Sequence, residues 1–176
     1  MNIFFLSLDP KEAAEALGDK HVIKMILEST QLLFTCAWII NPVWASNCPF
    51  KIYKKTHEHH PSTKWLCEKQ ANFLWLCDTA LAMCEEKLER WPNSPAHACH
   101  ETLKWMSKNP IPALYFKIKN ADNTITVPAS VVPDNLKPME NTVEAVIDAY
   151  KEYYKEKYKS GIVKYKILHK KPDWIK

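Results

Sequence analysis

The chain has 176 residues, of which 47% are hydrophobic and 25% charged, a composition typical of one globular domain with a buried core. This composition excludes an intrinsically disordered chain, which has too little apolar surface to form a core. The formal net charge of +4 is too small to identify a nucleic-acid-binding protein from charge alone.

Five helices are predicted after a short apolar segment at residues 2–8. They cover residues 10–18, 19–40, 61–91, 98–106 and 141–159. Asp9 followed by a proline is typical of a helix start, and Gly18 is a suitable end for this first helix. Asp19 is expected to cap the second helix and Asn141 the last one.

The segments between these helices are expected to be irregular. Residues 41–60 are predicted to form a loop, and residues 108–140 contain five prolines and a β-prone run at 124–127 that could form a small hairpin. The predicted fold is therefore mainly α: a compact single-domain helical bundle of about five helices, with an irregular proline-rich segment at 108–140 and a basic, aromatic tail at 159–176.

The six cysteines are interpreted as reduced thiols in the core. Three of them lie in the predicted helix 61–91, at spacings too long for a disulfide between them. The chain shows no secretory signal, and its apolar stretches are shorter than the ~20 residues that span a bilayer. We therefore expect an intracellular protein, in the cytoplasm or nucleus, with no membrane segment.

Polar residues form one stripe along the predicted helix 19–40, which is otherwise apolar. Helical spacing places these residues on one face: Lys20, Lys24, Glu28, Gln31 and Thr35. The simplest interpretation is a solvated face with a Lys24–Glu28 pair that contributes about 0.2–0.5 kcal/mol. The alternative is a functional surface on a buried helix.

The run from Gly18 to Glu28 resembles the pyrimidine-dimer DNA glycosylases, of the phage endonuclease V type and their bacterial relatives. In that family an Asp-x-His-apolar-apolar segment begins the equivalent helix, and the catalytic glutamate lies seven residues after the histidine, as Glu28 follows His21. The segment His59-His60-Pro61 with Lys64 is similar to a later part of the bacterial relatives. The resemblance covers residues 2–91 and, loosely, the aromatic tail, so the chain would be a divergent member.

The resemblance implies a base-excision glycosylase that acts on damaged or modified pyrimidines in double-stranded DNA, without a cofactor. In the family an N-terminal amine attacks C1′ of the nucleotide and a glutamate stabilises the charged sugar. An α-amine, with a pKa of about 7.7–8.0, is partly neutral near pH 8. Here that amine would be on Met1, because Asn2 is larger than the residues that permit removal of Met. Lys20, Lys24 or water could replace it, and Glu28 is expected to be catalytic in every case.

Contacts with a flipped or damaged base and its strand are expected from basic, polar and aromatic side chains. The candidates are Lys20, His21, Gln31, His59, His60, Lys64, Tyr153 and Tyr154. Tyr153 and Tyr154 could instead pack on the core of the domain. The protein is expected to be a monomer, inside a host cell if it is viral.

Two other readings of the sequence stay open. A non-catalytic nucleic-acid-binding or virion-associated protein could use the same scaffold. Histidines at 57–60 and the His97, Cys99 and His100 group could bind zinc, but their spacing fits no structural zinc pattern, and no metal is predicted. Cys67 and Cys99 as nucleophiles have no base at a predictable distance.

Overall fold

The computed structural model describes residues 2–167 and 170–176, and in these residues the chain is helical with no β-strand. The helices are α1 (Pro10–Glu15), α2 (Asp19–Ile40), α3 (Pro42–Ser46), α4 (Pro61–Leu66), α5 (Gln70–Arg90), α6 (His100–Lys108) and α7 (Val143–Lys159), with short 3-10 helices η1 (Ala113–Tyr115) and η2 (Asp134–Leu136). The prediction of a mainly α fold is confirmed. The predicted loop 41–60 contains α3, which Asn41 caps by accepting a hydrogen bond from Trp44 N.

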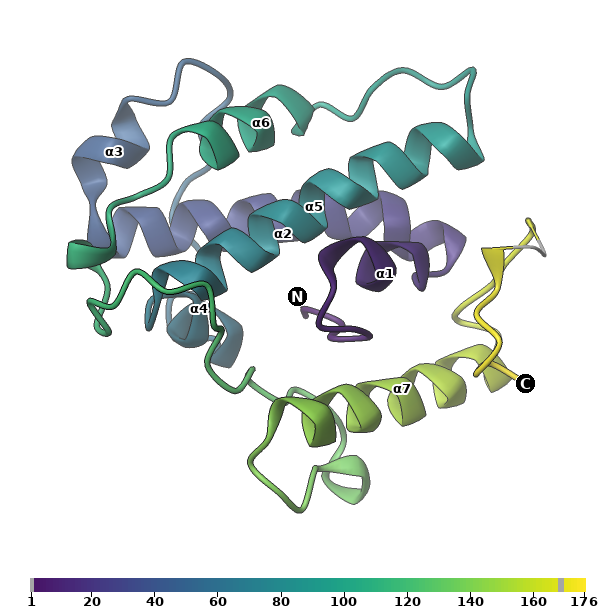
Figure 1. The fold of residues 1–176 in the computed structure, drawn as a ribbon. Helices are drawn as coiled ribbons and strands as arrows, with labels where there is room; N and C mark the ends of the chain where they lie inside the picture. The colour runs from purple at the N-terminus through teal and green to yellow at the C-terminus, as the bar shows by residue number, and fades with distance from the viewer. Residues whose placement is uncertain (1, 168–169) are drawn as a thin grey trace.

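Helices α2 and α5 form the centre of the fold and run past one another along their length (Figure 1). Side chains such as Ile26 and Leu33 of α2 and Phe73 of α5 are completely buried between the helices. Each buried side chain of this size contributes about 1.5–3 kcal/mol through removal from water. Helix α6 packs on α5, α4 on α2, and α1 across α5.

Helix α7 is separated from this central pair by the N-terminal segment, residues 2–8 (Figure 1). The Phe4 ring stacks on His21 of α2, with ring centroids 4.8 Å apart, and meets Tyr154 of α7 edge-on at 5.2 Å. The Tyr150 hydroxyl donates to Asn2 Oδ1 over 3.0 Å. The start of the chain therefore joins α2 to α7.

The predicted helix 61–91 is divided into α4 and α5, so its continuity was predicted wrongly. Asn72 Nδ2 donates to the Trp65 carbonyl, 2.7 Å away, and Asn72 Oδ1 accepts from Thr126 N. Lys69 is extended and forms an isolated bridge with Ile118. These bonds also anchor residues 118–126, and the predicted hairpin at 124–127 is absent from the described residues.

Two helix caps differ from the prediction. Helix α2 has the predicted bounds, but Gly18 is its N-cap, and Asp19 instead binds Arg90 Nη1 at 3.1 Å and accepts from Lys166 N at 2.7 Å. A Cβ at Gly18 would lie 2.6 Å from Val163 Cγ1, so the tail approaches too closely for a side chain there. The last helix is capped by Thr142 rather than Asn141, since Thr142 accepts from Ala145 N.

All six cysteines are buried and free, which confirms their interpretation as core thiols. By length and composition alone, α2 could cross a membrane: it has 22 residues, and an 18-residue stretch of it has a mean hydropathy of 1.4. However, 56% of that apolar stretch is buried inside the fold. Packing against α4 and α5 therefore accounts for its apolar character.

Candidate functional site

The polar stripe of α2 passes from solvent into the fold. Lys20 and Lys24 are exposed, Gln31 is half-buried, and Thr35 is completely buried. The Thr35 hydroxyl lies 2.8 Å from the carbonyl oxygen of Thr56, so the loop before α4 covers this end of the stripe. The simple reading of a uniformly solvated face is therefore incorrect.

Glu28 lies at the boundary between the exposed and buried parts of this stripe. Its side chain is 15% exposed, whereas that of Lys24 is 69% exposed, and the two form an ion pair with Nζ 3.1 Å from Oε1. A carboxylate that is largely shielded from water interacts more strongly with nearby positive charge than a solvated one. Glu28 is therefore placed to stabilise a cation that forms next to it.

The start of the chain runs beside this part of α2. Ile3 and Phe4 line a small internal gap together with Met25 and Ser29. Ser29 directly follows Glu28, and Met25 lies about one helical turn before it. Met1, the predicted source of the attacking amine, lies outside the described residues.

His21 is held as a neutral ring between the N-terminal segment and α7. Its pKa is lowered to about 4, first by burial and then by the nearby charges of Lys157 and Lys24, against an opposing effect of Glu28. The Tyr154 hydroxyl accepts a hydrogen bond from Gly18 N and lies 2.8 Å from His21 Nδ1. The Tyr154 proton is therefore available to Nδ1, which leaves the ring N–H on Nε2.

Tyr153 and Tyr154 of α7, both predicted as DNA contacts, have different environments. Tyr154 is completely buried, so its prediction as a DNA contact is wrong: it packs in the core and orients His21. Tyr153 is half-buried, with Lys157 Nζ 4.4 Å from its ring centroid. Lys157 also lies 6.0 Å from the Phe4 ring. The i+4 spacing of Lys157 from Tyr153 places both side chains on one face of α7.

The predicted residues around α4 lie near the buried end of the stripe. His60 caps α4, with its Nδ1 accepting from Ser62 N at 3.2 Å. His59 is exposed, with Nε2 3.7 Å from Glu58, and Lys64 is exposed on the last turn of α4. Thr56, which contacts Thr35 about two turns beyond Glu28, belongs to the same loop. These residues extend the polar surface at the buried end of the stripe. They are not part of the group formed by His21 with Phe4 and Tyr153.

Comparison with models of protein families, with curated proteins and with solved structures finds no match. The site is therefore assigned from its own side chains. It consists of a shielded carboxylate, Glu28, with an exposed lysine, Lys24, next to an aromatic group formed by Phe4, His21 and Tyr153. Cations and aromatic rings around one carboxylate suit a phosphate-bearing, planar ligand.

The structure gives no support to the zinc alternative. No group of three or more His, Cys, Asp or Glu side chains in the described part of the chain is placed to hold a metal ion. His97 Nδ1 accepts from Cys99 N at 3.2 Å, and the Cys99 thiol lies 3.2 Å from the Tyr53 hydroxyl. These side chains are engaged in local packing and capping.

Proposed function

We propose that the protein is a DNA base-excision glycosylase acting on damaged or modified pyrimidines, with Glu28 as its catalytic carboxylate. The observation that carries the proposal is the position of Glu28: shielded, paired with Lys24, and on the stretch of α2 along which the N-terminal segment runs. The seven-residue spacing between His21 and Glu28, which resembles that of the pyrimidine-dimer glycosylases, supports the same proposal.

The chemistry needs an amine and a carboxylate at one sugar. The amine nitrogen bonds to C1′ while the C1′–N1 bond breaks, so the pyrimidine leaves with the electron pair and takes up a proton. The resulting positive charge is stabilised by the Glu28 carboxylate. The nitrogen then passes a proton to O4′ as the C1′–O4′ bond breaks, which opens the sugar and leaves an iminium at C1′. Removal of a C2′ proton by Glu28 next to this iminium forms a C2′–C3′ double bond and expels the 3′ phosphate oxygen, which cuts the strand.

Two amines are candidates for the nucleophile. Met1 would supply the α-amine, which suits attack near neutral pH because a free α-amine has a pKa of about 7.7–8.0. Lys24 is the second candidate, since its Nζ lies 3.1 Å from Glu28 and could pass a proton to that carboxylate. Water would replace both in a glycosylase that does not cut the strand.

Double-stranded DNA would be held by the exposed charges and rings beside Glu28. Lys20 and Lys24 are exposed on the same helix face, and Lys157 with Tyr153 provides a cation and a ring on α7. Phosphate contacts of this kind give an affinity that falls steeply with salt. Aromatic side chains next to the opened DNA duplex would replace the stacking that a flipped base loses.

The decisive experiment compares Glu28→Gln with Glu101→Gln on duplexes carrying thymine dimers, modified pyrimidines or abasic sites. Glu101 is a matched control, because it also pairs with a lysine, Lys104, but is 58% exposed on α6. We expect Glu28→Gln to reduce base release by at least about 100-fold. Its stability should change by about 1 kcal/mol or less, because Gln has the size of Glu and keeps a side-chain carbonyl oxygen as an acceptor.

Borohydride trapping identifies the amine. A covalent adduct that disappears when extra residues precede Met1 points to the α-amine, and one that disappears in Lys24→Gln points to Lys24. Base release that is equal in Glu28→Gln and the wild type would refute the proposal. DNA binding without base release in the wild type would favour a non-catalytic binding protein that uses the Tyr153–Lys157 surface.

A further inference from the structure

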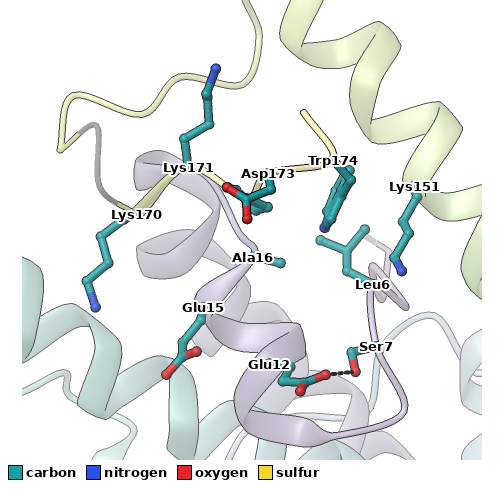
Figure 2. Close-up of a pocket in the computed structure, with 11 residues that line it drawn as sticks. Leu6, Ser7, Glu12, Glu15, Ala16, Lys151, Lys170, Lys171, Asp173 and Trp174 are labelled. Atoms are coloured by element: carbon teal, nitrogen blue, oxygen red, sulfur yellow. Dashed lines mark hydrogen bonds between the residues drawn. The ribbon is translucent and has the colours of Figure 1, made fainter. Parts of the chain in front are cut away.

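A second cleft, of about 560 Å³, lies between α1 and tail residues 170–174 (Figure 2). Tail residues form one side of it, Glu12 and Ala16 of α1 the opposite side, and Lys151 of α7 stands at one end. Its volume is within the range of about 300–1,000 Å³ that small-molecule sites occupy. None of its lining residues belongs to the carboxylate site of α2.

Trp174 gives this cleft an aromatic wall. The ring is half-buried and packs edge-on against Tyr154, with centroids 6.4 Å apart, so its position is fixed. Its indole N–H has no hydrogen-bond partner among the described residues, whereas Trp38, Trp65 and Trp75 each donate to a carbonyl oxygen. The wall therefore combines a stacking face with an available donor.

Two lysines of the cleft are not paired with carboxylates in the described residues. Lys151 Nζ lies 5.9 Å from the Trp174 ring, and Lys171 Nζ lies 5.5 Å from the Tyr158 ring. Lys170 differs, because it binds both Glu86 and Glu89. Two cations whose contacts are aromatic rings can neutralise an anionic group without breaking an ion pair.

Carboxylates lie on both sides of the same space. Glu12 accepts a hydrogen bond from Ser7 Oγ at 2.7 Å and faces the cleft from α1, and Asp173 is exposed on the tail side (Figure 2). An inorganic anion alone is disfavoured by these acids. A ligand that has both a phosphate and an amino edge satisfies the lysines and the carboxylates together.

We propose that this cleft binds a nucleoside 5′-phosphate unit whose base carries an exocyclic amino group, as a free mononucleotide or within a single strand. The base stacks on Trp174, its amino group donates to Glu12 or Asp173, and the phosphate is bound by Lys151 at one end of the cleft (Figure 2). This site is distinct from the carboxylate site and does not depend on glycosylase activity.

Calorimetric titration of the full chain with AMP, CMP and TMP tests the proposal, with adenosine and inorganic phosphate as partial ligands. We expect AMP and CMP to bind more tightly than TMP, adenosine or phosphate. Trp174→Leu should weaken AMP binding at least about fivefold, since base–aromatic stacking contributes ~1–3 kcal/mol. Trp174→Phe should restore most of it, which separates stacking from a folding defect.

The charge contacts are tested with Lys151→Gln, and Lys155→Gln is the matched control because Lys155 is on the same helix but paired with Glu152. Lys151→Gln should remove the preference for AMP over adenosine, and Lys155→Gln should leave it intact. A single-stranded oligonucleotide that binds with the same Trp174 dependence, while mononucleotides do not, would assign the site to a strand.

Equal binding of phosphate and AMP, or unchanged binding of every ligand by Trp174→Leu and Lys151→Gln, would overturn the proposal. Glu28→Gln must retain AMP binding. If Glu28→Gln loses base release but still binds AMP, the glycosylase function and the nucleotide site are tested independently of one another.

Discussion

The half-buried, neutral ring of His21 predicts a specific dependence of stability on pH. Its pKa is about 4 in the folded protein and close to 6.5 in the unfolded chain. Because the folded pKa is lowered, the unfolded state takes up the proton first as pH falls. The stabilisation from this ring is therefore complete above pH 6.5, declines between pH 6.5 and 4, and is constant below about pH 4.

The size of the effect follows from these two pKa values. Acidification from pH 7 to 5 would lower the free energy of unfolding by about 1.8 kcal/mol through this ring if the shift held in full. Since the ring is only half-buried, with solvent nearby, we expect about 1–1.5 kcal/mol.

Urea denaturation followed by circular dichroism at pH 7, 6 and 5 measures this effect in the wild type and in His21→Gln. The variant retains a polar partner for Tyr154 but cannot titrate, so its stability should fall by 1–1.5 kcal/mol less than that of the wild type. Carboxylates and other histidines contribute equally to both proteins and cancel in the difference. Parallel pH profiles would show that the ring is not desolvated between Phe4 and Tyr154, and the reasoning would be refuted.

Three stability predictions follow from other contacts. Arg90→Leu should lower the free energy of unfolding in urea by about 3–5 kcal/mol, because the completely buried guanidinium binds both Asp19 and Glu86. Asn72→Ala should cost about 1–3 kcal/mol and speed amide exchange near Thr126, since Thr126 N loses its acceptor and the Trp65 carbonyl loses one of its two donors. Gly18→Ala should lower the free energy of unfolding by about 1–3 kcal/mol, because the added Cβ would lie 2.6 Å from Val163 Cγ1. Adding Val163→Ala to this variant should recover part of the lost stability. If it recovers none, the Lys164 backbone is the obstacle.

The parts of the fold that depend on local sequence were predictable. Asp9 followed by Pro10 sets the start of α1, where the Asp9 side chain accepts from Glu12 N as predicted. The bounds of α2 followed from apolar periodicity and from the Asn-Pro pair after Ile40. In each case the deciding residues lie within one or two helical turns of one another.

The parts that were missed depend on contacts between distant residues. The break between α4 and α5 is stabilised by Thr126, which is 54 residues from Asn72. Gly18 replaces Asp19 as the cap because residues 163–166 pack against this turn. The partial burial of Glu28 is not visible in helical spacing, because the spacing says nothing about what covers the helix.

Tyr154 was predicted as a DNA contact, with packing on the core as the alternative, and it is the alternative that the structure shows. The i,i+4 spacing of Tyr150 and Tyr154 places them on one face of α7, and both are completely buried. Tyr153 falls on a neighbouring face and keeps its exposure. The helical period alone would have separated the core tyrosines from the surface one.

The closure of the N-terminal region by α7 and the tail has a consequence for synthesis on the ribosome. Asn2 meets Tyr150, the Gly18 amide bonds to Tyr154, and Asp19 binds the backbone of Lys166. The first two helices therefore emerge more than a hundred residues before the partners that cover them. A nascent chain stalled before α7 would present Phe4 and the open end of α2 to chaperones, so completion of the native state is delayed until translation is nearly finished.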